Sequence, residues 1–192
     1  MNKEKLLSFW KQEIVSTEDL GDRLSSQEAI SDFEAKHGVV LPEGFKSFLT
    51  EYGACSFNDL EQNFCVYMLD VGERSVPGFV AHNFIYNVDD IEDTLFELNE
   101  ELPDFWETDA ALIPPAMIPI ADSLADDNGY LLMNLAEKHY GSLWHWRFTQ
   151  NAWGDKGNDS IILIANSFED WLESLVTYEE AELIVAQGGS SV

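Results

Sequence analysis

The first 53 residues place their apolar side chains three or four positions apart, which is the spacing of one helix face. This pattern predicts helices over residues 1–14, 25–38 and 42–53. Ser25 and Glu28 form an S-x-x-E pattern, which is typical of the capping box at a helix start. A glycine ends the second and the third helix, and a proline begins the third. The chain is therefore expected to open with short amphipathic helices.

After residue 53 the apolar spacing changes to short runs rich in aromatic and β-branched residues, bounded by Gly, Asn and Asp. These runs predict six strands, over residues 63–69, 78–86, 116–122, 129–135, 142–148 and 160–166. The sequences DDNG (126–129) and KHYG (138–141) are typical of tight turns between strands. Consecutive strands with such short connections favour an antiparallel sheet.

Two further helices accompany the strands. Residues 88–101 carry Ile91, Leu95 and Leu98 on one side and acidic residues elsewhere, and residues 167–178 begin at Ser167, a typical N-cap residue. The order of elements predicts an α+β fold. In it, N-terminal helices pack on a mostly antiparallel twisted sheet of about five to six strands, with an inserted acidic helix and a C-terminal helix.

The length favours one domain over residues 1–192, with a helical extension (1–24), a core (25–178) and a C-terminal tail (179–192). We expect Phe45 and Leu49 to be buried between the helices and the sheet. Hydrophobic residues make up 45% of the chain, enough for a substantial core. No leader-like segment or membrane-length apolar run is evident, so we expect a cytoplasmic protein without membrane association.

The net charge of the chain limits the kinds of partner that it can bind. There are 36 acidic residues against 10 Lys and Arg, a formal net charge of -26. Direct binding of nucleic acid or of an anionic membrane needs a basic face, so both are excluded. Three explanations of the charge stay open: solubility, divalent-cation binding, or a basic macromolecular partner.

The distribution of the acids favours a partner. No Lys or Arg occurs from Ser75 through Glu137, and acids are concentrated in residues 89–109. Such local repulsion costs folding free energy, which suggests a use, although a merely solvated face is the alternative. Phe105 could anchor a partner within this run, and so could Trp106, which could equally belong to the core. The candidate partner-binding residues are Asp89, Asp90, Glu92, Asp93, Glu97, Glu100, Glu101, Asp104, Trp106 and Glu107.

No motif for chemistry accompanies these acids. The segment 122–128 has several Asp residues but not the register of a calcium loop, and the histidines lack zinc-site spacing. Cys55 and Cys65 fit no zinc or redox pattern. The sequence 154–160 lacks the phosphate-loop pattern and is expected to be a surface turn. We therefore predict no catalytic residue, no metal, no cofactor and no enzymatic activity; oligomeric state is not predictable.

The pieces together resemble the SUKH superfamily, which includes bacterial immunity proteins and a yeast cell-wall assembly regulator. The resemblance covers roughly residues 25–178 and rests on motifs in a characteristic order. These are Ile30, Phe33-Glu34, Gly38, Leu41-Pro42, Phe45, Leu49 and Tyr52-Gly53, then IPIADSLADDNGYLLMNL (118–135) and IANSFEDWLESL (164–175).

The resemblance implies a non-enzymatic immunity protein that binds and neutralises a cognate toxin of a polymorphic or contact-dependent toxin system, commonly a nuclease. A nuclease holds phosphates in a basic cleft, so an acidic face could occupy that cleft. The alternative is a regulatory scaffold that binds an endogenous protein partner. Residues 1–24 and the loop 149–160 depart from the family pattern, and specificity could also lie there.

Overall fold

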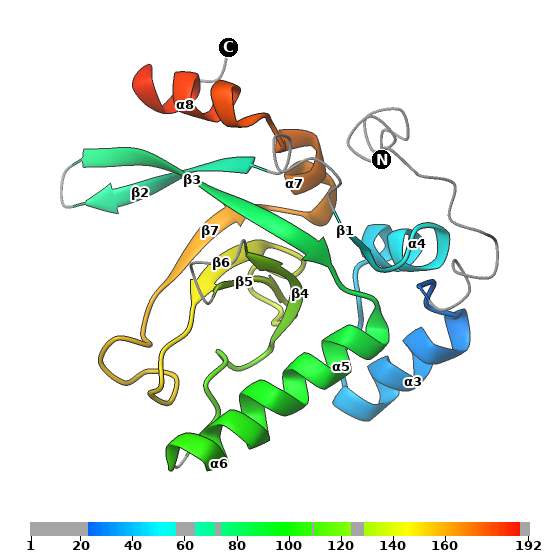
Figure 1. The fold of residues 1–192 in the computed structure, drawn as a ribbon. Helices are drawn as coiled ribbons and strands as arrows, with labels where there is room; N and C mark the ends of the chain where they lie inside the picture. Colours follow the sequence, from blue (N-terminus) through cyan, green and yellow to red (C-terminus); the bar gives the residue numbers. More distant parts are fainter. Residues whose placement is uncertain (1–22, 57–63, 72–73, 109, 124–128, 189–192) are drawn as a thin grey trace.

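The computed structural model describes residues 23–56, 64–71, 74–108, 110–123 and 129–188 (Figure 1). The helix expected over residues 1–14 and most of the expected turn at 126–129 lie outside these ranges. The described elements form the predicted α+β arrangement, in which helices surround a twisted antiparallel sheet.

The first described helices are α3 (Gln27–His37) and α4 (Glu43–Glu51). Ser26, not Ser25, is the N-cap of α3, and its side chain accepts a hydrogen bond from the Ala29 N–H at 3.0 Å. The Ser25 hydroxyl is turned inward instead, where it accepts from the N–H of Val88 at 3.0 Å. The expected capping box is therefore wrong: the N-cap lies one residue later, and the residue three positions on is Ala29, which has no side-chain oxygen to complete the box.

The turn between α3 and α4 follows the prediction more closely. Gly38 ends α3 in the left-handed conformation, with φ of 64°. The Glu34 carboxylate then accepts from the Leu41 N–H at 2.7 Å and lies 3.4 Å from the Lys46 amine on α4. One side chain of α3 thus stabilises the extended link and the start of the next helix.

Every predicted strand is present, within three residues at each end, except at the start of β3. The strands are β1 (Cys55–Ser56), β2 (Phe64–Val71), β3 (Arg74–Ile85), β4 (Met117–Ser123), β5 (Gly129–Asn134), β6 (Leu143–Arg147) and β7 (Ile161–Ala165). Their order in the sheet is β1-β3-β4-β5-β6-β7, and β2 also pairs with β3. All of these pairs are antiparallel, as predicted.

Strand β3 is longer than predicted because it serves two pairings (Figure 1). Its residues 74–81 pair with β2, whereas Phe84 and Ile85 pair with both β1 and β4. The change of partner falls between Ala81 and His82, because His82 already pairs with Ser123 of β4, and a register shift between His82 and Phe84 then interrupts the β3–β4 pairing. The β2–β3 ribbon therefore projects from the edge of the main sheet.

After β3 come three helical pieces that are continuous with one another. They are α5 (Val88–Phe96), the π-helical turn η1 (Glu97–Glu101) and α6 (Leu102–Trp106). After β7 come α7 (Phe168–Ser174) and α8 (Tyr178–Ala186). Helix α8 was not predicted, since residues 179–192 were expected to be a tail. In the described part of the chain, no helix has both the length and the apolar character needed to span a bilayer.

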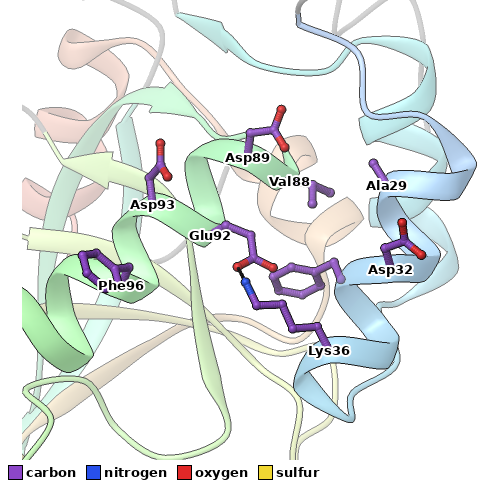
Figure 2. Close-up of a pocket in the computed structure, with 9 residues that line it drawn as sticks. Ala29, Asp32, Lys36, Val88, Asp89, Glu92, Asp93 and Phe96 are labelled. Carbon is purple, nitrogen blue, oxygen red and sulfur yellow. Dashed lines mark hydrogen bonds and ion pairs between the residues drawn. The ribbon is translucent and has the colours of Figure 1, made fainter.

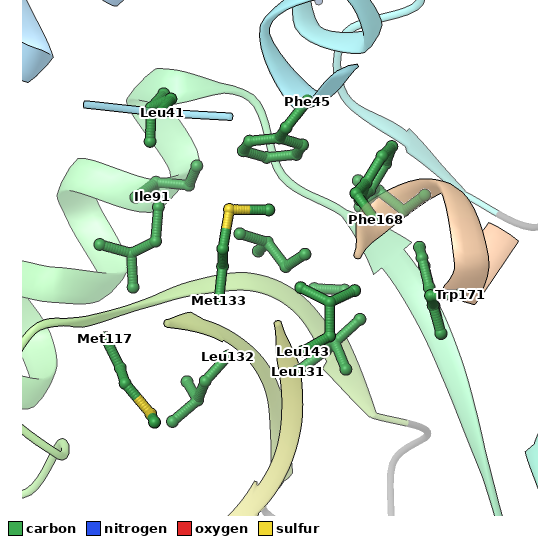
Figure 3. Close-up of a cluster of buried hydrophobic side chains, with 14 of the residues drawn as sticks. Leu41, Phe45, Ile91, Met117, Leu131, Leu132, Met133, Leu143, Phe168 and Trp171 are labelled. Carbon is green, nitrogen blue, oxygen red and sulfur yellow. The ribbon is translucent and has the colours of Figure 1, made fainter. Parts of the chain in front are cut away.

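The core lies between the sheet and helices α3, α4, α5 and α7 (Figure 3). Phe45 and Leu49 are fully buried, as predicted. The Phe45 ring lies 5.0 Å from the Phe168 ring of α7, and Met133 of β5 lies beneath them. Helix α4, in the first part of the described chain, and helix α7, in its last part, thus pack against each other over the sheet.

Candidate partner-binding face

The candidate acidic residues between Asp89 and Asp104 lie on one continuous helical segment over residues 88–106, which we call the acidic helix. It begins with a capping box: the Asn87 side chain accepts from the Asp90 N–H, and the Asp90 carboxylate accepts from the Asn87 N–H at 3.0 Å. Near its end, the Leu102 N–H donates to the Glu97 carbonyl five residues back. Pro103 follows directly, and its ring disfavours a regular α-turn, so the wider turn accommodates it.

Not all predicted site residues face solvent. Asp90, Glu92, Glu97 and Trp106 are half-buried. The exposed acids of the acidic helix and its C-cap are Asp89, Asp93, Glu100, Glu101, Asp104 and Glu107. They are the carboxylates that a partner could reach without competing with internal contacts.

Asp90 serves the helix itself. Burial raises the pKa of its carboxyl group; the hydrogen bond from the Asn87 backbone opposes this rise, and the charges of Asp89 and Asp93 add to it. One of its oxygens accepts from the N–H of Asn87, the N-cap of α5, and its negative charge lies in the first turn, where the helix dipole favours it.

Glu92 joins the acidic helix to α3. Its carboxylate accepts from the Lys36 amine and lies 2.9 Å from Nε2 of His37. Burial would raise the pKa of Glu92, but the hydrogen bonds and charges of Lys36 and His37 outweigh it, so the pKa is lowered. Glu92 is therefore an ionised residue whose charge is already compensated within the fold.

Aromatic side chains lie among these acids. Phe105 is 77% exposed, and Phe96, which the sequence analysis did not single out, is 55% exposed. Trp106 instead packs against the core, with its ring 6.2 Å from that of Phe148. Ile91, Leu95 and Leu98 form the apolar side of this helix, and Phe96 does not lie on that side. The sequence pattern therefore indicated that Phe96 would face outward.

An open groove of about 550 Å³ lies between α3 and α5 (Figure 2). Its apolar lining comes from both helices: Ala29, Phe33, Val88 and Phe96. Its charged lining consists of Asp32, Lys36, Asp89, Glu92 and Asp93. Lys36 reaches across to Glu92, whereas Asp32, Asp89 and Asp93 are exposed carboxylates on the two sides of the groove.

A second groove, of about 460 Å³, lies along another side of α5. It is lined by Leu95 and Asn99 of the acidic helix, by residues 110, 111 and 113–118, and by His37, Val39, Leu135 and Trp153. Trp153 belongs to the loop 149–160, one of the two segments that depart from the family pattern. The acidic helix and this loop, the two surfaces considered for partner specificity, therefore border the same groove.

The loop 149–160 is held from within by Asn158, which is 1% exposed. Its side-chain oxygen accepts from the Trp146 indole N–H at 2.8 Å, and its amide donates to the carbonyls of Leu112 and Asn151, both at 2.8 Å. The Trp153 N–H donates to the Ala111 carbonyl at 2.9 Å. The expected surface turn is thus an ordered loop tied to the segment that follows the acidic helix.

The buried Cys65 lies 3.9 Å from Nδ1 of His82, an arrangement that could suggest nucleophilic chemistry. Burial raises the pKa of Cys65 to about 12 and lowers that of His82 to about 3, with the nearby His145 as a second cause for His82. Both groups are therefore neutral near pH 7. A reactive thiolate would need a lowered thiol pKa, so this pair is a packing contact.

A model of the SMI1 / KNR4 family (SUKH-1) matches residues 25–174. The chain belongs to this family. The match runs from Ser25, just before α3, to the last residue of α7, and so includes the sheet and the acidic helix but not α8. It confirms the resemblance seen in the sequence.

SUKH-1 membership is consistent with a domain of the immunity-protein type, in a family known for binding proteins rather than enzymes. A search of curated proteins finds no match to this chain. The family thus supports a protein-binding role and leaves the partner to be inferred from the surface.

Proposed function

We propose that this SUKH-1 protein is an immunity protein that binds a basic toxin domain, a nuclease, through the acidic helix. The observation that carries the proposal is the set of exposed carboxylates at Asp89, Asp93, Glu100, Glu101 and Asp104, accompanied by exposed Phe96 and Phe105. Charge of one sign draws a partner of the opposite sign, and exposed aromatic rings supply apolar contact area.

A nuclease fits this surface because its active-site cleft must attract phosphates. An acidic helix that enters or covers the cleft competes with the nucleic acid for the same cationic groups. Steering by opposite charge raises association rates, to about 10⁸–10⁹ M⁻¹s⁻¹ at low salt in favourable cases. A fast inhibitor suits a target that acts on the cell's own nucleic acid.

Co-expression tests the proposal. The C-terminal domain encoded by the gene directly upstream is induced in cells with and without the protein, and growth and complex formation are measured. Rescue together with a purified one-to-one complex is expected. Failure to rescue, combined with capture of an endogenous protein at the acidic helix, would favour the regulatory-scaffold alternative.

The test needs a variant that separates binding from folding. Replacing Glu100, Glu101 and Asp104 with Lys changes exposed residues only, so folding should persist while rescue is lost. The matched control replaces Glu51, Glu137 and Glu179, which are exposed on α4, after β5 and on α8, and carries the same change in net charge. Equal rescue by both variants would rule out the acidic helix as the binding surface.

A further inference from the structure

The groove between α3 and α5 combines the two surfaces that a long cationic side chain needs. Phe33 and Val88 are buried and Phe96 is exposed, so apolar carbon lines the groove from its base to its rim. Asp32 stands on the α3 side, and Asp89 and Asp93 stand on the α5 side (Figure 2). Lys and Arg side chains bind surfaces of this kind, with their stems on apolar groups and their charged heads in polar surroundings.

The groove already holds one cation of the chain itself. Lys36 extends from α3, and its amine bonds to Glu92 on the opposite wall. His37 lies against the same carboxylate. These two contacts compensate Glu92 alone, so the groove accepts a basic side chain and still presents three further carboxylates.

The arrangement of those carboxylates is unfavourable without a cation. Asp89 and Asp93 are four positions apart on one helix, where like charges repel. Their charges also contribute to the raised pKa of the neighbouring Asp90, after burial. A cation placed between Asp32 and this pair would remove the repulsion.

We infer that this groove receives an arginine side chain of the protein partner, an inference that rests on the proposed function and specifies one contact within it. Arginine fits better than lysine because its planar guanidinium can bond two carboxylates at once and stack on an aromatic ring. Phe96 supplies such a ring at the rim. The second groove, which borders Trp153, is lined mainly by apolar residues, with His37 and Asn99 as its polar lining residues, and offers no comparable charge complementarity.

A small probe tests the groove without the toxin. The capped tripeptide Gly-Arg-Gly is titrated into the ¹⁵N-labelled full-length protein, and the analogue with uncharged citrulline serves as the ligand control. The arginine peptide should shift amide signals of residues 29–36 and 88–96 with a Kd of about 1 mM, the range of a single side-chain contact. The citrulline peptide should bind at least tenfold more weakly.

Matched variants show where the peptide binds. Asp32→Asn with Asp93→Asn should weaken binding at least tenfold. Glu137→Gln with Glu179→Gln removes the same two negative charges at exposed sites outside the groove and should leave binding unchanged. Weak shifts spread over the whole acidic surface, or equal effects of the two pairs, would overturn the inference.

The result of the arginine-binding test can be distinguished from the result of the co-expression test of the proposed function. Rescue of toxin-expressing cells with no arginine binding in the groove rejects this contact and keeps the immunity role. Arginine binding in a protein that neither rescues cells nor binds the toxin rejects the immunity role and leaves a groove selective for arginine.

Discussion

Asn158 ties the loop 149–160 to β6 and to the segment that follows the acidic helix, so its removal tests how the wall of the second groove is held in place. Its side chain makes three hydrogen bonds, to Trp146 of β6, to Leu112 after the acidic helix and to Asn151 in its own loop. Asn158→Ala removes all three and leaves the buried Trp146 N–H without this acceptor.

The expected cost follows from these contacts. A buried hydrogen bond contributes about 1 kcal/mol net, and a buried group left without a partner costs about 1–3 kcal/mol. Asn158→Ala should therefore lower the free energy of unfolding by about 3–5 kcal/mol, a large fraction of the stability of an ordinary domain. Asn158→Asp should cost at least as much, because it places a charged acceptor against two carbonyl oxygens.

Urea denaturation of the purified protein measures this loss. Asn151→Ala is the matched control in the same loop, since Asn151 is exposed and its amide bonds to the Lys156 carbonyl at 3.1 Å; it should cost under about 1 kcal/mol. Hydrogen exchange at the Trp153 amide should also accelerate in Asn158→Ala. A loss equal to that of Asn151→Ala would refute the argument that the loop is anchored from its interior.

Two further predictions concern the core. Phe45→Ala should cost about 3–5 kcal/mol and weaken binding only through unfolding; a stable Phe45→Ala protein that has lost partner binding would place this region at the interface. His82, whose pKa burial lowers to about 3, takes up its proton in the unfolded chain near pH 6.5, so its folded state loses stability as pH falls. The wild type should lose about 2 kcal/mol more than His82→Gln between pH 7.5 and 5. Equal losses in urea titrations would contradict this assignment.

Local sequence patterns were sufficient to predict most of the fold, because each pattern determines the type and the ends of a single helix or strand. The strands have β-branched and aromatic runs, and Gly38 ends α3 as its sequence position indicated. Thr177 and Glu180 form a capping box that begins α8, and this T-x-x-E pattern was available in the sequence. The prediction of one helix over residues 167–178 conflicts with this capping box, because α7 ends at Ser174 and a new helix begins after Thr177.

The candidate site was only partly predictable, since burial is decided by tertiary contacts. Composition pointed to residues 89–109, but no local signal distinguishes Asp90 and Glu92, which bond within the fold, from exposed Asp89 and Asp93. Asn158 looked like a turn residue, and only the position of Trp146 gives it a buried role. The groove requires α3 and α5 to lie side by side, which no pattern in either helix specifies.

The effect of salt on association with the toxin domain tests the central claim, that the acidic helix is the binding face. Association and dissociation rates are measured by stopped flow at about 0.02 M and about 0.3 M salt, because screening shortens the Debye length to about 8 Å already at 0.15 M. Wild type is compared with the Lys triple variant at Glu100, Glu101 and Asp104 and with the control triple variant at Glu51, Glu137 and Glu179.

Wild-type association should slow steeply with salt. At low salt the acidic-helix variant should associate at least tenfold more slowly than the control variant, with a smaller change in dissociation, because steering acts on the encounter. Association rates that are equal in the two variants at both salt concentrations would contradict the claim that the acidic helix meets the partner.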